Sequence, residues 1–503
     1  MRTAGILLPV SSLPSDFGIG SFSKEAYEFI DFLHNAAQGA WQVLPMNPTG
    51  YSNSPYQPIS AFAGNPYFIS LEELINQGLL NRDEVNNAFY GELDDCVDYS
   101  AVYQTHPRLL KLAASRFFEQ GEQNKSKYTA FVKKAVYWLH DYAMFMALKD
   151  LHNQAPWTQW EEGYKKRDPK KMEQAEIELQ EQIVYYYFEQ FIFRRQWTTL
   201  KEYAHSKQVK LIGDMPFYIA EDSADCWAHP EIFNLDQNGK PLTVDGCPPD
   251  ALCAYGQKWG NPTYNWENQK KDGYAWWMMR FKQMMNLYDM IRVDHFGGFA
   301  ECYAIPYNQE SAENGAMSTG PGMDFVEKVK EICSSQQIIA EDLGRMTKAK
   351  ETLMKDSGFY GMHVLQYAFN NVESIHLTHF HTKNSVVYTG THDNTTTRSY
   401  LEEMSHDERE YARRYIRSIN TDYGQFTWDF IAEAYRSTAD FCIIPLQDYL
   451  VLDKNSRIND PAKSDINWRW RLKKDTLSEA LAISINHLSG TYGRYPRETA
   501  TKV

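Results

Sequence analysis

The sequence lacks the features that mark secreted, membrane-spanning and metal-binding proteins. Its seven cysteines are dispersed, with no close Cys-x-x-Cys pair, at positions 96, 226, 247, 253, 302, 333 and 442. This set predicts reduced thiols, a cytoplasmic location and no metal site. The first residues contain neither a long apolar run nor a cleavage pattern, and no segment approaches membrane-spanning length. We therefore expect no signal peptide and no membrane partner.

Positive charge is also scarce. The chain has 51 Lys and Arg against 65 Asp and Glu, a net charge of −14, which argues against nucleic acid or an anionic membrane as the main partner. Hydrophobic residues make up 43% of the 503 residues, enough for a large core, so wholesale disorder is excluded. The high aromatic content, 14%, fits either a large core or sugar binding, because pyranose C–H faces pack on aromatic rings. Composition alone leaves both readings open.

Eight short apolar or β-branched runs predict parallel strands, near residues 6, 41, 209, 290, 337, 361, 386 and 441. Helical periodicity separates several of them, for example over 24–35, 323–333 and 407–419. Eight is the number of strands that closes a (β/α)8 barrel, so we predict an α/β protein of the TIM-barrel class. Residues 1–503 are expected to form a single catalytic barrel. Because 477–488 is amphipathic, no separate C-terminal β-domain is expected.

Two long segments interrupt the strand and helix rhythm. Residues 46–206 join a turn-rich loop, 46–66, to an almost wholly helical stretch, which we interpret as an inserted subdomain after the second strand. Residues 219–266 show no clear periodicity and predict an irregular, loop-rich, substrate-binding insertion after the third strand, because such long loops are uncommon unless functional. Trp259 lies there between two glycines and favours a role in stacking on substrate.

Two predicted strands end in aspartates that are candidates for catalysis or substrate binding. Strand alternation places Arg292 and Asp294 on the same face, and a neighbouring arginine keeps an aspartate ionised. An ionised, oriented aspartate suits nucleophilic attack on an anomeric carbon, although structural Arg–Asp pairs at strand ends are also common. Asp214 ends the third strand and is read either as a loop cap or, with modest preference, as a substrate contact.

Two later strands also end in carboxylates. Glu341 and Asp342 lie on opposite faces of one strand, and periodicity does not decide which of them points into the barrel. His392 and Asp393 follow another strand, and a metal-binding reading lacks a third and fourth ligand nearby. The C-terminal ends of barrel strands meet at one mouth, so we predict that carboxylates from three strands act on one sugar.

Eight short motifs, in order along the chain, carry a resemblance to a known family. They are Leu-Pro-Val-Ser-Ser-Leu-Pro (8–14), Ser-Pro-Tyr-Gln-Pro (54–58), Asp-Met-Pro (214–216), Pro-Pro-Asp (248–250), Gly-Gln-Lys-Trp-Gly-Asn-Pro (256–262), Arg-Val-Asp-His-Phe (292–296), Ala-Glu-Asp-Leu-Gly (340–344) and Thr-Gly-Thr-His-Asp-Asn (389–394). Nearly end to end, the chain resembles 4-α-glucanotransferases of the amylomaltase type, also called disproportionating enzymes, which form glycoside hydrolase family 77 and are related to the α-amylase superfamily.

The resemblance implies roles for individual residues. Asp294 would be the nucleophile that forms a β-linked glucosyl-enzyme, and Glu341, rather than its neighbour Asp342, the general acid/base. Asp393 would grip ring hydroxyls and stabilise the oxocarbenium-like transition state. The residues implied in substrate binding are Tyr56, Asp214, Trp259, Arg292, His392 and Asn459. As the acid, Glu341 should have a raised pKa.

The implied activity is transfer of α-1,4-glucan segments between maltodextrin or starch-type chains, or to glucose, with no cofactor. The alternatives are an α-amylase-like hydrolase and a non-catalytic glucan-binding protein. Four positions depart from the usual family pattern: Gly297 replaces a common arginine, Asn370 and Thr395 replace frequent aspartates, and Ala462 lies where a Pro-Gly-Thr pattern is usual. These departures bear on outlying subsites and on the ratio of transfer to hydrolysis, and leave the three carboxylates intact. Oligomeric state is not predicted.

Overall fold

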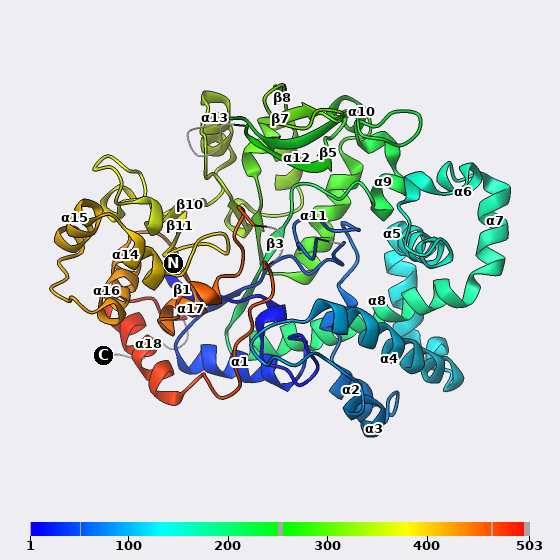
Figure 1. Cartoon of the computed structure of the whole chain (residues 1–503), viewed down its shortest axis with the longest axis horizontal. Helices are drawn as coiled ribbons and strands as arrows, with labels where there is room; N and C mark the ends of the chain where they lie inside the picture. The colour runs from blue at the N-terminus through cyan, green and yellow to red at the C-terminus, as the bar shows by residue number, and fades with distance from the viewer. Residues whose placement is uncertain (1, 51, 250–254, 464–465, 497–503) are drawn as a thin grey trace.

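The computed structural model describes residues 2–50, 52–249, 255–463 and 466–496 (Figure 1). Its main sheet consists of eight parallel strands, β1 (Thr3–Leu7), β2 (Ala40–Gln42), β3 (Lys210–Met215), β6 (Met290–Val293), β9 (Ile338–Ala340), β10 (Gly361–Val364), β11 (Ser385–Tyr388) and β12 (Phe441–Pro445). The strand order is β10-β11-β12-β1-β2-β3-β6-β9. A parallel bridge between Ile339 and Tyr360 joins the two edges, so the sheet closes into the predicted (β/α)8 barrel.

The interior of the barrel is a packed core. Residues from successive strands fill it, among them Leu7, Ala40, Ile212, Met290, Ile339, Met362, Val386 and Ile443. Buried polar groups at this core are paired with each other, as where Tyr388 donates a hydrogen bond to Oε1 of Gln42 over 2.9 Å. Strands buried on both faces appear in the sequence as continuous apolar runs, which is why their positions could be predicted.

Helices connect the strands around the outside. They are α1 (Lys24–Asn35), α11 (Ala275–Leu287), α12 (Met323–Lys330), α13 (Lys348–Ser357), α14 (Thr397–Glu403), α15 (His406–Ile416) and α16 (Tyr423–Arg436). After β12 come the short α17 (Leu446–Tyr449) and α18 (Glu479–Thr491), which packs against α1. The described residues beyond β12 contain no further strand, in agreement with the expected absence of a C-terminal β-domain.

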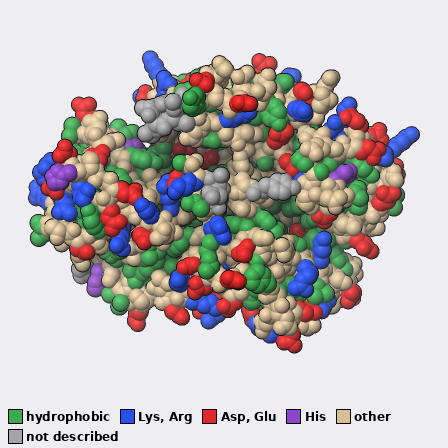
Figure 2. Space-filling model, viewed as in Figure 1, with side chains coloured by type: hydrophobic (Ala, Val, Ile, Leu, Met, Phe, Trp, Pro, Cys, Tyr) green, Lys and Arg blue, Asp and Glu red, His purple; other side chains and the backbone are tan. Residues whose placement is uncertain are grey.

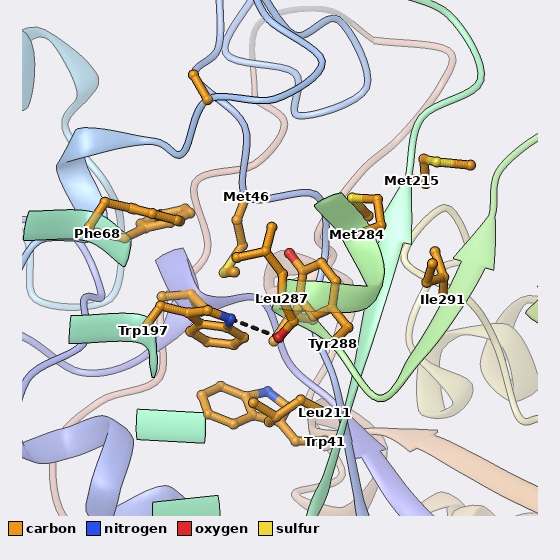
Figure 3. Packing of buried hydrophobic residues seen from close by; sticks show 14 of the residues in the cluster. Trp41, Met46, Phe68, Trp197, Leu211, Met215, Met284, Leu287, Tyr288 and Ile291 are labelled. Carbon is orange, nitrogen blue, oxygen red and sulfur yellow. Dashed lines mark hydrogen bonds between the residues drawn. The ribbon is translucent and has the colours of Figure 1, made fainter. Parts of the chain in front are cut away.

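The segment between β2 and β3 contains α2 (Leu71–Asn76), α3 (Arg82–Asn86), α4 (Tyr99–Glu119), α5 (Ser126–Leu151), α6 (Glu162–Lys165), α7 (Pro169–Glu178) and α8 (Gln180–Ser206), which lie to one side of the barrel in Figure 1. Helix α8 is attached to the barrel through Trp197, whose Nε1 donates to the carbonyl oxygen of Leu287 over 2.9 Å (Figure 3). The Trp197 ring packs 5.8 Å from that of Tyr288. A Cβ at Gly213 would lie 2.2 Å from the Tyr288 ring, so only glycine permits this close packing.

The segment 219–266 is more regular than the sequence predicts. It contains α9 (Ala224–Ala228) and the strands β4 (Thr243–Cys247) and β5 (Gln257–Pro262), and α10 (Trp266–Lys271) begins at its end. These strands pair antiparallel with each other and with β7 (Glu301–Pro306), which in turn pairs with β8 (Ala316–Thr319). The prediction of irregular structure was incomplete because β4 is stabilised by a partner far along the chain. Local strand propensity was low at Asp245, whose buried carboxylate accepts from Asn261.

The surface of the protein carries both signs of charge, and several described cysteines are free thiols. Basic and acidic side chains are interspersed over the face in Figure 2. None of the helices in the described part of the chain combines the length and apolarity needed to cross a membrane. Free thiols are found at Cys96, Cys226, Cys302, Cys333 and Cys442. Cys253, together with Asp250 of one family motif, lies outside the described residues.

Candidate active site

Arg292 at the end of β6 is the centre of the candidate site. Its Nη1 donates to both carboxylate oxygens of Asp214 over 2.8 Å and to Oδ1 of Asp294 over 3.2 Å. Its Nη2 lies 3.9 Å from Oε2 of Glu341. One guanidinium therefore joins carboxylates from β3 and from the residues directly after β6 and β9, as expected where barrel strands end at a common mouth. Burial lowers the pKa of Arg292, but the surrounding carboxylates, Asp214 first, raise it well above its usual range.

Asp214 is the fully buried member of this group. Its side chain has no exposed surface, whereas the side chains of Asp294 and Glu341 are 25% and 17% exposed. Besides Arg292, Asp214 accepts a hydrogen bond from the hydroxyl of Tyr56 over 2.7 Å. Asp214 therefore contacts Arg292 and Tyr56, and its predicted contact with substrate stays a prediction.

Glu341 points toward Arg292 and also receives a backbone donor. The N–H of His295 donates to Oε2 of Glu341 over 2.6 Å. His295 has the left-handed conformation, with φ 46° and ψ 44°, which is unfavourable for a residue other than glycine and is typical of strained functional turns. Asp342 points elsewhere and accepts from the backbone N–H of Met362 over 2.8 Å. Strand alternation could not decide which of the two acids faces the site. In the structure Glu341 points toward Arg292, and Asp342 points toward the backbone of Met362.

The protonation of Glu341 differs from that of an ordinary glutamate. Burial raises its pKa to about 7, against the opposing effect of the Arg292 guanidinium, and the negative charge of Asp294 raises it further. Its usual pKa is about 4.3. The raised pKa that an acid catalyst requires is therefore present at Glu341. Burial also lowers the pKa of His295 to about 4, which keeps its imidazole neutral beside these carboxylates.

Asp393 lies in the loop after β11 and is held by three neighbours. Asn459 donates from Nδ2 to its Oδ1 over 2.6 Å, and Nε2 of His392 lies 3.2 Å from the same oxygen. Arg457 binds the backbone of this region, donating to the carbonyl oxygens of Asp393 and Asn459 over 2.6 and 2.7 Å. The carboxylate is fixed yet 42% exposed, so it faces the open side of the site.

Aromatic rings form the wall next to Asp393. The rings of Tyr56 and His392 stack with centroids 4.7 Å apart, and Trp468 packs 5.7 Å from Tyr56. The Tyr56 hydroxyl lies 3.3 Å from Nδ1 of His392, which links the Asp393 loop to Asp214. Trp259 lies farther out, on β5, with 36% of its surface exposed and its ring 5.9 Å from that of His295.

All nine candidate residues lie on strand ends, on the loops that follow them, or on β5, and Trp259 is, as a whole residue, the most exposed of them. Sequence reasoning missed Arg457, Trp468 and the backbone N–H of His295. Arg457 precedes the predicted Asn459 by two residues, a spacing that could have drawn attention to it. Trp468 lies in a segment without periodicity, and a backbone donor leaves no trace in a side-chain pattern. Among the described residues, no group of three or more His, Cys, Asp or Glu side chains is arranged to hold a metal.

Comparison with known proteins places this chain in a family. The family profile described as 4-alpha-glucanotransferase matches residues 8–477. The 4-alpha-glucanotransferase of Clostridium butyricum is 41% identical over 96% of this chain and 99% of its own length, and that of Thermus thermophilus 38% identical over 95% and 96%. Among solved structures, the amylomaltase of Streptococcus agalactiae in complex with acarbose has a TM-score of 0.95 at 33% identity, covering 98% of this chain and all of that one. The chain therefore belongs to the 4-alpha-glucanotransferase family.

Proposed function

We propose that this 4-alpha-glucanotransferase works by a retaining double displacement with Asp294 as nucleophile and Glu341 as general acid/base. In the first step Glu341 donates its proton to the glycosidic oxygen, the bond from that oxygen to C1 breaks, and Asp294 forms an ester with C1. In the second step Glu341 removes the proton of an incoming 4-hydroxyl, whose oxygen attacks C1 and expels Asp294. The configuration at C1 is inverted twice and so retained.

The observation that carries this proposal is the position of two neighbouring carboxyl groups beside Arg292. Asp294 accepts a hydrogen bond from Nη1 of the permanently charged Arg292 over 3.2 Å. Glu341 has a pKa of about 7 because it is buried, so a substantial fraction is protonated near neutral pH. A retaining mechanism needs one carboxyl group as nucleophile and a second that can donate a proton, and the raised pKa of Glu341 suits it to the second role.

The remaining candidates are proposed to bind the sugar that reacts. Asp393, with His392 beside it, would accept hydrogen bonds from ring hydroxyls, and its negative charge would stabilise the positive charge that develops at C1. Asn459 would keep that carboxylate oriented. Tyr56 would pack against the same glucose, whereas buried Asp214 would act through Arg292 and Tyr56.

We also propose that segment 219–266 is a substrate-binding subdomain and that 46–206 is an inserted subdomain completing the groove. Trp259 supports the first assignment, since its exposed ring on β5 is suited to stacking on an outlying sugar. The loop carrying Tyr56 supports the second. Gln57 from that loop donates to the carbonyl oxygen of Trp259 over 3.0 Å, so the two segments meet.

The proposed donors and acceptors are α-1,4-glucans and maltooligosaccharides, with no role for nucleic acid. The acarbose complex of the Streptococcus agalactiae relative supports an oligosaccharide ligand of this class. We further propose that the enzyme works in the cytoplasm, which the disulfide-free thiols of Cys96, Cys226, Cys302, Cys333 and Cys442 support.

Incubation of the pure protein with maltotriose tests the activity. Transfer produces glucose together with a ladder of longer maltodextrins, whereas an α-amylase-like hydrolase raises the number of reducing ends without longer products. The Asp294→Ala variant distinguishes an enzyme from a glucan-binding protein, because it should bind maltooligosaccharides while losing turnover. Activity that survives this substitution would disprove the proposed nucleophile.

A further inference from the structure

Gly297 marks a close approach between the candidate site and α13. A Cβ at this position would lie 3.0 Å from Cδ and 3.2 Å from Cε of Lys350. Gly297 belongs to the 3-10 turn Phe296–Phe299, directly after the strained His295. The absence of a side chain at 297 therefore lets the aliphatic part of Lys350 lie against the backbone beside the site.

Lys350 is held in this position by the start of its helix. Thr347 is the N-cap of α13 and accepts from the backbone N–H of Lys350 over 3.4 Å. The Thr347 hydroxyl donates in turn to Oε1 of Glu301 on β7 over 2.5 Å, which fixes the helix to the small sheet, beside which it lies in Figure 1. The first turn of α13 is thus anchored on both sides.

The Lys350 side chain lines the same hollow as Glu341. His295 and Asp342 also contribute to the wall of this hollow. Lys350 is the one lysine or arginine among the described residues that line it. The positive charge of Lys350 lowers the pKa of His295 in addition to the larger effect of burial, which is consistent with an ammonium near that ring.

The ammonium of Lys350 has no protein partner among the described residues, with which it forms neither an ion pair nor a hydrogen bond. An ammonium carries three donors and no acceptor. Lys350 and Glu341 both line the hollow, and a sugar presents hydroxyl oxygens as acceptors. The unused donors therefore suit a ligand that occupies the hollow.

We propose that Lys350 binds the sugar on the acceptor side of Glu341 and thereby sets the affinity for acceptors. This assignment rests on the proposed function: Glu341 must reach the oxygen that joins the donor glucose to the next sugar, so that next sugar lies at the hollow which Glu341 shares with Lys350. The ligand class is glucose or the non-reducing end of a maltooligosaccharide. Lys350 contributes hydrogen bonds to hydroxyls and takes no part in proton transfer.

The test separates the two halves of the reaction. α-Maltotriosyl fluoride forms the glycosyl-enzyme without an acceptor-side sugar, because fluoride leaves in its place. Lys350→Met should keep the initial rate of fluoride release within about twofold, yet raise the KM for glucose or maltose as acceptor about tenfold, the usual effect of losing a hydrogen bond from a charged donor. Lys350→Arg should recover part of the acceptor affinity.

Two further variants sharpen the result. Lys355→Met removes an exposed lysine from the same helix and should leave acceptor KM unchanged. Gly297→Ala alone should displace the aliphatic part of Lys350 and raise the KM for acceptors. When it is combined with Lys350→Met, it should raise that KM no further. An unchanged acceptor KM in Lys350→Met would overturn the assignment of Lys350. Failure of the wild-type protein to release fluoride or to form the covalent intermediate would instead overturn the proposed function.

Discussion

Asn459 donates a hydrogen bond from Nδ2 to Oδ1 of Asp393 over 2.6 Å, joining the segment after β12 to the loop after β11. The backbone repeats the connection, since the N–H of Asn459 donates to the carbonyl oxygen of His392 over 3.1 Å. Asn459 is buried, whereas Asp393 is partly exposed. The amide therefore acts as a fixed support from which the carboxylate reaches into the open site.

Removal of this support should slow the reaction with little effect on stability. In Asn459→Ala the Asp393 carboxylate loses a charge-assisted hydrogen bond, and a misplaced carboxylate stabilises the transition state less well. We expect kcat/KM for maltotriose disproportionation to fall by roughly 10- to 100-fold. Asn455→Ala, in the exposed turn nearby, is the matched control and should retain wild-type kinetics, since within the described part of the chain its side chain donates a hydrogen bond only to Asp453. Equal losses in both variants would point to a general loosening of the segment.

The raised pKa of Glu341 predicts the alkaline limb of the pH profile. The proposed mechanism requires protonated Glu341 in the free enzyme. Because the pKa of Glu341 is about 7, kcat/KM should fall as pH rises above that value. Glu341→Gln should remove this limb and reduce turnover of maltotriose by roughly 10²- to 10⁴-fold. With an α-glycosyl fluoride the loss in the first step should be much smaller, because fluoride leaves without protonation.

Asp342 provides the control for this assignment. Burial raises the pKa of Asp342 to about 6. Judged by pKa alone, Asp342 could therefore also produce the alkaline limb. Its carboxylate, however, accepts from the N–H of Met362 rather than pointing at Arg292. Asp342→Asn retains an oxygen acceptor for that N–H and should leave the midpoint of the alkaline limb in place. If the alkaline limb shifted in Asp342→Asn but stayed in place in Glu341→Gln, Asp342 and not Glu341 would be the general acid.

The barrel could be predicted because its signals are local. Each central strand is buried on both faces and therefore appears as an apolar run, and each run ends where polar residues begin, as at Arg292 and Glu341. The eight predicted strands correspond to β1, β2, β3, β6, β9, β10, β11 and β12. Helix α1 has the predicted bounds because its apolar residues recur at helical spacing after Ser23.

What escaped prediction depends on partners distant in the chain. Strand β4 pairs with β7, about sixty residues away, and its Asp245 accepts hydrogen bonds from Asn261 of β5. The burial of Asp214 is likewise a tertiary effect, because it follows from the positions of Arg292 and Tyr56. Strand periodicity could place Asp214 at the mouth of the barrel, but whether it faces ligand or protein depends on neighbours that the local sequence does not reveal.

Glu189 in α8 predicts a dependence of stability on alkaline pH. The side chain is buried in the helical insertion and accepts from the hydroxyl of Tyr185. Burial raises its pKa to about 8, so the folded protein retains a proton that the unfolded chain, with a pKa near 4.3, has released. Stability should therefore decline as pH rises from about 5 to 8, by on the order of 3 kcal/mol from this group.

Glu189→Gln should remove that decline, since the amide keeps an oxygen to accept from Tyr185 and has no proton to lose. We expect its melting temperature to exceed that of the wild type at pH 8 and to approach it at pH 5. Glu181→Gln, at an exposed position of the same helix, should melt like the wild type throughout. Parallel melting curves for the wild type and Glu189→Gln across this range would mean that Glu189 is ionised in the folded protein.

Three histidines near β10 predict the opposite, acid-sided dependence. The rings of His363 and His381 stack with centroids 4.0 Å apart, and that of His376 lies 6.0 Å from His363. Nδ1 of His363 is buried without a hydrogen-bond partner among the described residues. Burial lowers the pKa values of His363, His376 and His381 to about 3, 4 and 4. Below about pH 6.5 the unfolded chain takes up protons that the folded protein excludes. The free energy of unfolding therefore decreases as the pH is lowered.

His363→Phe should reduce this acid sensitivity, because the substitution keeps a ring to stack on His381 and removes a titrating group that has no partner. Between pH 7 and pH 5 the wild type should lose up to about 2 kcal/mol more than the variant, seen as a larger drop in melting temperature. His406→Phe at the exposed start of α15 alters a histidine outside the cluster and should keep the wild-type slope. If His363→Phe shows the same slope as the wild type, then the folded protein must admit a proton to this cluster, and the stacked pair must open well above pH 4.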